Sequence, residues 1–324
     1  MDLDSKKSLI KSSLDFGNKL CAYAFLHKSI DTAKKHRLCC YNTTRLSDSN
    51  FNSVEMKKIR SDMLQNKSID GCKGCYEKES KKILSPRQKS IVEFKTDLVK
   101  CLDLENQEPI WYDLRISNNC NLACQMCNAF SSSTIAKKHG LDNSYLSYEP
   151  DIAINANSKR IYLAGGEPFL IKKFATLLSK ITNTDCEIIV NTNATVITKA
   201  LLNQLLRFQN VNITVSLDGY KEINEKIRLG SNWEEIDSNI NQFRELGFSL
   251  HANTVLQKDN VYSLIDLGNY LQENGFIKWT IEPVKNRTYF EVTELDQLII
   301  DQLLSMPLVK NNPTTVALLL SLRK

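Results

Sequence analysis

From residue 110 onward, short runs of apolar and β-branched residues alternate with segments whose apolar residues have helical spacing. The six strand-like runs are 110–116, 160–164, 186–191, 211–217, 248–256 and 277–281. Helical spacing is clear in 200–208, 233–246 and 262–274, and Gly247 and Gly275 follow the last two, as glycine often follows a helix. Repeated strand–helix units predict an α/β fold with a parallel sheet. Six units favour a partial (β/α)6 TIM-like barrel over a complete eight-stranded one.

Unusual sequences directly follow four of these predicted strands. They are the Cys120–Cys127 run after the first, Gly165-Gly166-Glu167-Pro168 after the second, Thr192-Asn193-Ala194 after the third and Ser216-Leu217-Asp218-Gly219 at the end of the fourth. In barrels of this kind, reactive groups lie in the loops at the carboxyl ends of the strands. The four segments are therefore expected on one face, where they would form a single site.

The run CNLACQMC places Cys120, Cys124 and Cys127 at C-x3-C-x2-C spacing. Three such cysteines can ligate three irons of a [4Fe–4S] cluster. A cluster used only for electron transfer normally has a protein ligand on every iron, so this spacing indicates an iron that is open to a small molecule. Gly165-Gly166 would allow close backbone approach to a ligand, although GGEP alone would more often be a simple turn.

Length and composition set broader limits. The 324 residues suggest about two domains, and 42 basic against 37 acidic residues leave a mild excess of +5, which is weak support for nucleic-acid binding. The start lacks the apolar segment of a signal peptide, and the longest apolar run, Val316–Leu320, is too short to span a bilayer. A soluble cytoplasmic protein is expected. In that compartment ten cysteines favour metal binding over disulfides, with Cys101 and Cys186 most simply read as buried apolar residues.

A second cysteine group lies in the N-terminal third. It comprises Cys21, Cys39, Cys40, Cys72 and Cys75. The C-x2-C pair is a common half-site for zinc or for iron–sulfur. The segment 20–88 has few strand-like runs and much Lys, Ser and Asn, so it is expected to bury little core without a metal. Four ligands would be Cys21, one of Cys39 and Cys40, Cys72 and Cys75.

CNLACQMC followed about 40 residues later by AGGEPFL resembles the radical S-adenosylmethionine (SAM) superfamily over residues 108–285. The resemblance implies a [4Fe–4S] cluster on Cys120, Cys124 and Cys127, with SAM on the fourth iron. An electron from a donor such as flavodoxin or ferredoxin would cleave SAM to a 5′-deoxyadenosyl radical, which abstracts hydrogen from a substrate. The cofactors supply this chemistry, and the protein orients them.

The resemblance also implies a set of SAM-binding residues. They are Met126, Gly165, Gly166, Glu167, Pro168, Asn193, Ser216 and Arg228. Met126 replaces the family's usual aromatic near the adenine, and Ala194 replaces the glycine of a TNG motif. Gly165, Gly166 and Glu167 would receive the SAM amino group, while Ser216 would face the ribose or carboxylate and Arg228 would pair with the carboxylate. The alternative for Arg228 is a solvated helix residue, and for Asn193 and Ser216 ordinary turn chemistry.

The segments LCAYAF, RLCC and GCKGCYEKES resemble, more loosely, the N-terminal cysteine module of twitch-type proteins, which are relatives of the SPASM group. This resemblance implies a second, auxiliary [4Fe–4S] cluster, with zinc as the alternative. The expected domains are an N-terminal cysteine-rich module (1–105), a radical SAM core (106–290) and a helical extension (291–324). A linker over 81–88 and a helix over 90–102 would join the first two. The tail is expected to form two helices that either pack on the barrel or cover its mouth.

Two classes of function follow. The first is a radical SAM enzyme acting on a peptide, a protein or a small metabolite, and the second is a non-catalytic iron–sulfur protein for electron transfer or sensing. An RNA substrate has little support, because no basic stripe with interleaved aromatics is present. His251, Asn253 and Glu282 are candidate substrate-side residues, although a satisfied core histidine and a surface glutamate are the simpler interpretations. No proton-transfer residue is assigned.

Overall fold

A computed structural model describes residues 2–15, 17–33, 35–42, 44–102, 107–141, 152–284 and 291–323. The predicted α/β class is confirmed, with a sheet of eight strands in the order β2-β1-β3-β4-β5-β6-β7-β8. The chain forms two compact units. Unit 1 comprises Met1–Ile116, Pro150–Tyr162 and Lys180–Asn183, and unit 2 comprises Ser117–Glu149, Leu163–Ser179 and Thr184–Lys324. The domain boundaries expected from the sequence stay a prediction.

All six predicted strands are present. They are β3 (Trp111–Leu114), β4 (Arg160–Leu163), β5 (Glu187–Thr192), β6 (Asn210–Ser216), β7 (Ser249–Leu256) and β8 (Lys278–Pro283). In unit 2, β5, β6, β7 and β8 pair in parallel in chain order, which is consistent with a partial barrel. Two further strands were not predicted, β1 (His27–Ile30) and β2 (His36–Arg37), because their short, polar sequences carry no strand pattern. β1 is parallel to β3 and antiparallel to β2.

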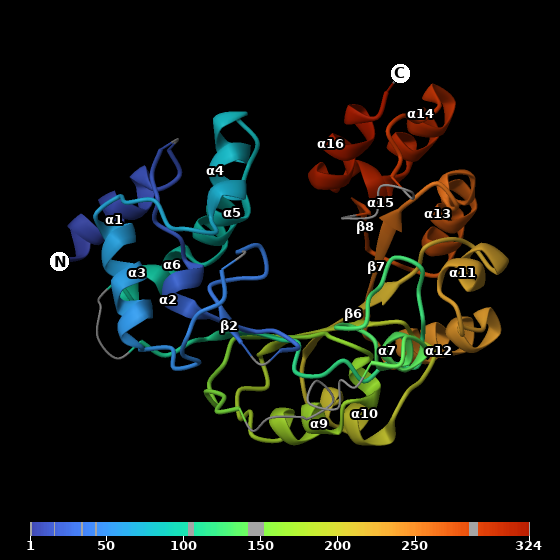
Figure 1. Cartoon of the computed structure of the whole chain (residues 1–324), viewed down its shortest axis with the longest axis horizontal. Helices are drawn as coiled ribbons and strands as arrows, with labels where there is room; N and C mark the ends of the chain where they lie inside the picture. The colour runs from blue at the N-terminus through green and yellow to red at the C-terminus, as the bar shows by residue number, and fades with distance from the viewer. Residues whose placement is uncertain are drawn as a thin grey trace. The chain divides into compact units, whose positions relative to one another are not determined.

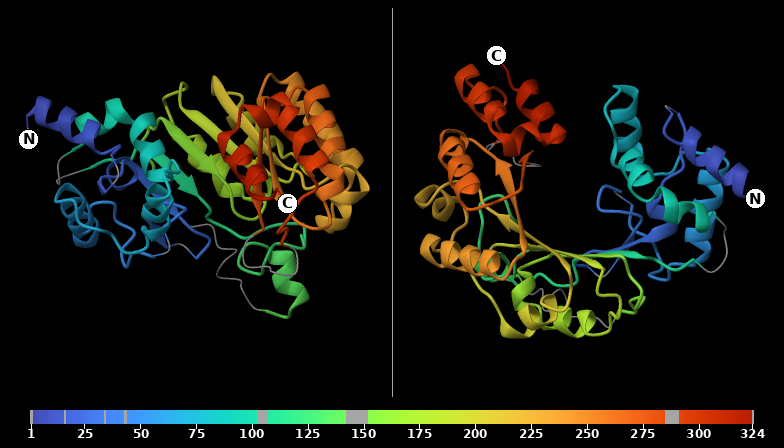
Figure 2. Two further views of the ribbon diagram at one scale, coloured as in Figure 1. Left: turned by 90° about the horizontal axis from the view of Figure 1, so that it is seen from above. Right: turned by 180° about the vertical axis from the view of Figure 1, so that it is seen from behind.

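The strands of unit 2 bury one face against helices. Along β7, buried Leu250, Ala252, Thr254 and Leu256 alternate with half-buried residues. The helices of this region are α9 (Lys172–Leu178), α10 (Lys199–Leu205), α11 (Glu222–Ile227), α12 (Trp233–Glu245) and α13 (Leu264–Glu273). Helices α10, α12 and α13 lie on one side of strands β5–β8 (Figures 1 and 2). The period-2 burial and the one-sided helices leave the other strand face without a helical cover within this unit.

The C-terminal residues form three helices, where two were expected. These are α14 (Gln297–Ser305), α15 (Pro307–Lys310) and α16 (Pro313–Ser321). Pro307 and Pro313 each stand at the start of a helix, where the missing N–H costs nothing. The Asn312 side chain donates to the Trp279 carbonyl at 2.8 Å, and the Thr315 hydroxyl accepts from the Ile281 N–H at 3.0 Å. The tail therefore satisfies the open edge of β8, which an exposed strand would otherwise leave unpaired.

Unit 1 contains α1 (Leu3–Ser12), α2 (Tyr23–Leu26), α3 (Val54–Leu64), α4 (Lys73–Ser80), α5 (Pro86–Glu93) and α6 (Lys95–Lys100). Contrary to the expectation of little core, it buries a contiguous apolar cluster that includes Phe25, Met56, Met63, Ile91 and Leu98. Short polar sequences between the apolar residues hide this cluster in the sequence, because its members are spread from Ile10 to Leu102.

The predicted linker and the helix after it need correction. Helix α5 begins at Pro86, inside the expected linker, and Ser85 forms a capping box with Gln88. The expected single helix over 90–102 is two helices, α5 and α6, which meet at Phe94. Among the residues that the structure describes, no helix has the length and apolar character needed to cross a membrane.

Candidate functional site

The loop between β3 and α7 (Ser133–Lys138) carries the three-cysteine run in unit 2. The start of α7 holds this loop: the hydroxyls of Ser133 and Thr134 donate to the Cys120 carbonyl at 3.2 and 2.7 Å. The Leu122 N–H donates to the Cys120 sulfur at 3.5 Å, and the Cys127 N–H donates to the Cys124 carbonyl at 3.0 Å. All three thiols are half-buried, and each lies close enough to the others for their charges to interact.

Position 166 requires glycine because the backbone at Asn119 passes close to it. The φ of Gly166 is 50°, and a Cβ at this position would collide with the Asn119 carbonyl. The next residue, Glu167, donates its N–H to that same carbonyl at 2.7 Å. Asn119 directly precedes Cys120, so this backbone contact joins the GGEP segment to the cysteine loop. A glycine at position 166 therefore reflects close backbone packing, whatever ligand lies beyond it.

The Glu167 carboxylate is fully buried and is already bound by protein donors. It accepts from the Thr192 hydroxyl at 2.7 Å, the Asn193 N–H at 2.7 Å and the Phe169 N–H at 3.1 Å. Burial raises the pKa of Glu167 to about 7, and these three donors oppose that rise. Pro168 starts the short helix η1 (Pro168–Leu170) that follows. Glu167 thus ties the loop after β4 to the loop after β5, and its predicted contact with SAM stays a prediction.

Asn193 links the loop after β5 to the cysteine loop. Its side chain donates to the Asn121 side chain at 3.1 Å, and its oxygen accepts from the Thr195 N–H at 2.9 Å. Ala194 has a φ of 57°, in the left-handed region that favours glycine. Glycine adopts this conformation without strain, so Ala194 holds a backbone that is less favourable for a residue with a Cβ.

Arg228 and Asp218 form a buried ion pair, with Nη2 and Oδ2 2.7 Å apart. The side chains are 10% and 0% exposed, so the interpretation of Arg228 as a solvated helix residue is wrong. The other Asp218 oxygen accepts from the Val255 N–H at 2.7 Å, and the Asp218 N–H donates to the Asn224 side chain at 2.9 Å. The sequence did not identify Asp218 as the buried partner of Arg228. The signal that could have done so is its place directly after an apolar strand.

Ser216 and Met126 are two further residues predicted to bind SAM. Ser216 is the last residue of β6 and is 8% exposed, while Met126 is half-buried in the cysteine loop. Cys120, Cys124, Arg228 and Glu167 interact electrostatically within the same part of unit 2. The structure therefore gathers the residues predicted from the carboxyl ends of the strands, and it leaves their roles with SAM as predictions.

The face of β5–β8 that no helix covers is polar. Register places Asn191 beside Thr214, Thr214 beside His251 and His251 beside Lys278. The same face carries, nearer the carboxyl ends, Ser216, Asn253, Thr280 and Glu282. Most of these residues are half-buried, and burial lowers the pKa of His251 to about 4, so it is neutral at pH 7.

Five of these side chains form no hydrogen bond within the described ranges of the chain. They are Asn191, Thr214, His251, Asn253 and Glu282. Barrel interiors are ordinarily filled with bulky branched residues. A half-buried face with unused donors and acceptors is instead suited to a polar ligand.

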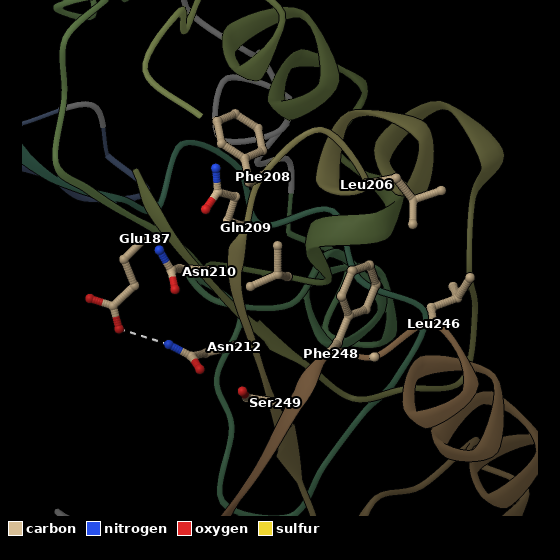
Figure 3. A pocket seen from close by; sticks show the side chains of 11 residues that line it. Glu187, Leu206, Phe208, Gln209, Asn210, Asn212, Leu246, Phe248 and Ser249 are labelled. Atoms are coloured by element: carbon tan, nitrogen blue, oxygen red, sulfur yellow. Dashed lines mark hydrogen bonds between the residues drawn. The ribbon is translucent and has the colours of Figure 1, made fainter. Parts of the chain in front are cut away.

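A separate hollow of about 470 Å³ lies at the amino ends of β5, β6 and β7 (Figure 3). Its polar side includes Glu187 and Asn212, which are joined by a 2.7 Å hydrogen bond. Figure 3 also shows the apolar side chains of Leu206, Leu246 and Phe248 around it. This end of the strands is opposite to the cysteine loop, and barrel enzymes place their reactive groups at the carboxyl ends.

The N-terminal cysteine group lies within unit 1. Cys21 and Cys39 are each 6% exposed, Cys72 and Cys75 are half-buried around the start of α4, and Cys40 is exposed. The Asn42 side chain donates to the Cys72 sulfur at 3.2 Å, and the Cys21 sulfur lies 3.8 Å from the Ser90 hydroxyl. Burial raises the pKa of Cys21 to about 12, and the neighbouring Cys72 and Cys75 add to this rise. None of the ten cysteines forms a disulfide.

A buried ion pair supports this cysteine group and was not anticipated. Arg87 contacts both oxygens of Glu79 at 2.8 Å, with side chains 3% and 2% exposed. The same guanidinium donates to the carbonyls of Ser13 and Leu20 at 2.7 and 2.8 Å. Arg87 therefore joins the segment before Cys21 to the helix that carries Cys75. The sequence concealed this role because Arg87 fell within the expected linker.

Within the described ranges, no three His, Cys, Asp or Glu residues are grouped around a point that could hold a single metal ion. In a [4Fe–4S] cluster each cysteine bonds a different iron, so the cysteine sulfurs do not meet at one point.

Parts of the chain are similar to known proteins. Residues 114–267 match the profile described as "Radical SAM superfamily". A GTP 3′,8-cyclase of Helicobacter pylori is 26% identical over 212 residues, which cover 57% of this chain and 63% of that protein. An AdoMet-dependent heme synthase of Nitratidesulfovibrio vulgaris is 23% identical over 176 residues, which cover 51% of this chain and 46% of that protein. The chain thus spans about half to two thirds of the length of these curated relatives.

Solved structures overlap with the chain in part. Streptococcus suis SuiB bound to S-adenosylmethionine gives a TM-score of 0.44 at 16% identity, covering 80% of this chain and 62% of SuiB. The protein anSMEcpe with bound AdoMet gives a TM-score of 0.42 at 17% identity, covering 57% of this chain and 55% of that chain.

Proposed function

Because residues 114–267 match the radical SAM superfamily profile, we propose that this protein is an enzyme that reductively cleaves S-adenosylmethionine at a [4Fe–4S] cluster. Cys120, Cys124 and Cys127 would hold the cluster. When bound, the cluster and SAM supply a 5′-deoxyadenosyl radical that abstracts hydrogen from a substrate. The observation that carries the proposal is the meeting of the three-thiol loop with the segments that follow β4, β5 and β6, all within unit 2.

The chemistry of the donors fits this cofactor. Cluster ligands are thiolates. Burial is the largest influence that raises the pKa of Cys124, and the Arg228 charge is the largest influence that lowers it. The Leu122 N–H donor at 3.5 Å likewise suits a charged sulfur on Cys120. Arg228 Nε is buried and has no hydrogen-bond partner in the described chain, which is a state that a bound anionic group would relieve.

The protein's own residues then hold and orient the ligands. Gly166 and Glu167 fix the base of the cysteine loop, and Asn193 fixes its side through Asn121. Met126, Ser216 and Arg228 would contact SAM. Each assignment rests on the sequence resemblance together with the position of the residue in unit 2.

The polar face of β5–β8 supports a polar substrate, with a peptide or protein segment as the leading class. Asn191, Thr214 and Asn253 offer unused amide and hydroxyl groups of the kind that pair with peptide amides. Two carboxylates on this face, Glu187 and Glu282, outnumber the one ammonium of Lys278. A nucleoside triphosphate, as in the GTP cyclases, would find little positive charge here. Small metabolites and RNA are the alternative substrate classes to be tested.

The N-terminal group would hold a second [4Fe–4S] cluster in a twitch-like module. The ligands would be Cys21, Cys39, Cys72 and Cys75, because these four are buried or half-buried together whereas Cys40 is exposed. With four protein ligands, every iron of the cluster is occupied, which suits acceptance of an electron from a product radical. Zinc is the competing metal, and metal analysis of the purified protein separates the two.

The test of the main proposal is release of 5′-deoxyadenosine from SAM by anaerobically reconstituted protein with a chemical reductant, followed by mass spectrometry. Cys124→Ala is expected to abolish release, while Cys101→Ser, outside both cysteine groups, retains it. Release that survives Cys124→Ala overturns the mechanism. A wild-type protein that binds iron but neither binds nor cleaves SAM is instead a non-catalytic iron–sulfur protein.

A further inference from the structure

The cysteine loop and the segment after α11 run side by side in unit 2. The Ala123 N–H donates to the Leu229 carbonyl, and the Gln125 N–H donates to the Ile227 carbonyl, each at 2.9 Å. These two bonds flank Cys124 on one segment and Arg228 on the other. The Gln125 side chain adds a 3.0 Å bond to the Lys226 carbonyl. Cys124 and Arg228 are therefore opposite members of a short ladder.

Arg228 brings a buried positive charge to this position. The residue is 8% exposed, and Asp218, its ion-pair partner at 2.7 Å, is 0% exposed. The Val255 N–H holds the second Asp218 oxygen, which fixes the carboxylate on the side of the guanidinium. Arg228 interacts electrostatically with both Cys124 and Cys127. Charges buried in this way are screened much less by salt than charges at the surface.

A buried charge next to an iron–sulfur cluster changes the free energy of reduction, because reduction adds one negative charge to the cluster. A cation favours the reduced state and raises the reduction potential; an anion does the opposite. Net charge and nearby hydrogen bonds are among the factors that set such potentials. The ladder therefore places Arg228, which should raise the reduction potential, opposite Cys124. Asp218, which should lower the potential, is held next to Arg228.

We propose that Arg228 and Asp218 act as a pair of positioning residues that set the reduction potential of the cluster on Cys120, Cys124 and Cys127. The inference rests on the proposed function, since it requires a cluster at these cysteines. It differs from the predicted contact between Arg228 and the SAM carboxylate, because the effect on the potential exists before SAM binds. The sequence assigned no functional role to Asp218, and this proposal gives it one.

The experiment is a redox titration of the reconstituted full-length protein without SAM, followed by electron paramagnetic resonance. The signal of this cluster is identified afterwards as the one that SAM perturbs. Arg228→Gln is expected to lower the reduced-to-oxidised ratio at a fixed potential about tenfold, which is 59 mV for one electron. Asp218→Asn is expected to raise that ratio by a similar factor. The double variant, with both charges removed, should fall between the two.

Lys226→Gln is the matched control. It removes a positive charge two residues from Arg228, but its side chain is 57% exposed and pairs with Asp259 at the surface. Screening by solvent should limit its shift to less than about twofold. If Arg228→Gln alone does not fold with its cluster, the same charge is measured by comparing the double variant with Asp218→Asn.

Two results distinguish failure of the proposed function from failure of the inference about Arg228 and Asp218. Absence of any SAM-perturbed cluster signal in the wild-type protein overturns the proposed function itself. A normal wild-type cluster whose potential moves in the same direction in both single variants, or in neither, overturns only the inference about Arg228 and Asp218.

Discussion

The two cysteine groups are built in opposite ways. In unit 2, Cys120, Cys124 and Cys127 lie on one loop and are half-buried, with a buried cation opposite the middle thiol. In unit 1, the four inward cysteines come from three separate segments, and two of them are almost fully buried. Local sequence brings the first group together, whereas only the fold brings the second together.

This difference fits the proposed roles of the two groups, an open cluster site in unit 2 and a closed one in unit 1. A closed site has all its ligands from the protein and serves structure or electron transfer, while a catalytic site keeps a position for a ligand. In unit 1 the Cys72 and Cys21 sulfurs have neutral side-chain partners, Asn42 and Ser90, and the nearby Arg87 is paired with Glu79. In unit 2 Arg228 keeps one N–H without a partner among the residues described. The comparison predicts that the two sites respond differently to substitution.

The largest expected effect separates two adjacent cysteines. Cys39→Ser should remove the N-terminal metal, about half of the iron if both clusters are [4Fe–4S], because Cys39 is buried beside Cys21 and Cys72. Cys40→Ser is the matched control and should retain that metal, since Cys40 is exposed. Iron and sulfide analysis of the reconstituted proteins measures both. Equal losses from the two variants would show that the ligand set is wrong.

A smaller effect is expected at the ion pair of Arg87 and Glu79, beside the proposed closed site in unit 1. Glu79→Gln leaves the Arg87 charge buried without its partner, so unit 1 should lose about 3–5 kcal/mol of unfolding free energy. The control, Asp62→Asn, breaks the surface pair of Asp62 with Lys58 in the same unit and should change stability little. Denaturant unfolding measures both. Similar small losses would mean that the buried pair is not a major support.

Acid should weaken unit 1 more than unit 2. Burial lowers the pKa of His27 to about 4, against a weaker opposing effect of Asp113, and lowers the pKa of His36 to about 3. Both histidines are neutral when folded, so their stability contribution is complete above about pH 6.5 and is lost as pH falls toward 4. Between pH 7 and pH 5, His27 alone should cost about 2 kcal/mol.

Hydrogen exchange at the two pH values, corrected for intrinsic rates, checks this difference between the units. His27→Gln should remove part of the loss in unit 1. Unit 2 has one histidine with a lowered pKa, His251, where unit 1 has His27 and His36, so unit 2 should lose less. Equal weakening of both units on acidification would contradict the assignment to the buried histidines.

Sequence reasoning succeeded where the signal is local. The strands β5–β8 were found within two residues of their ends, because β-branched residues with period-2 burial mark them. It failed for β1 and β2, which are short and polar, and β1 pairs with β3, a strand that lies far away in the chain. It also failed at Arg87 and Asp218. A charged residue looks the same in sequence whether it is solvated or buried against a partner 8 or 10 residues away.

The sequence by itself determined the α/β class, the three-cysteine loop and its place after a strand, since these depend on spacing along the chain. Only the tertiary structure decided that Cys39 is buried while Cys40 is exposed, that Gly166 packs against the Asn119 carbonyl, and that Arg228 lies opposite Cys124. The burial of a side chain and the partner of its charge depend on which segments meet in space. The energy of the charge depends on its burial and on its partner. For that reason the candidate ligands could be named from the sequence, but their electrostatic setting could not.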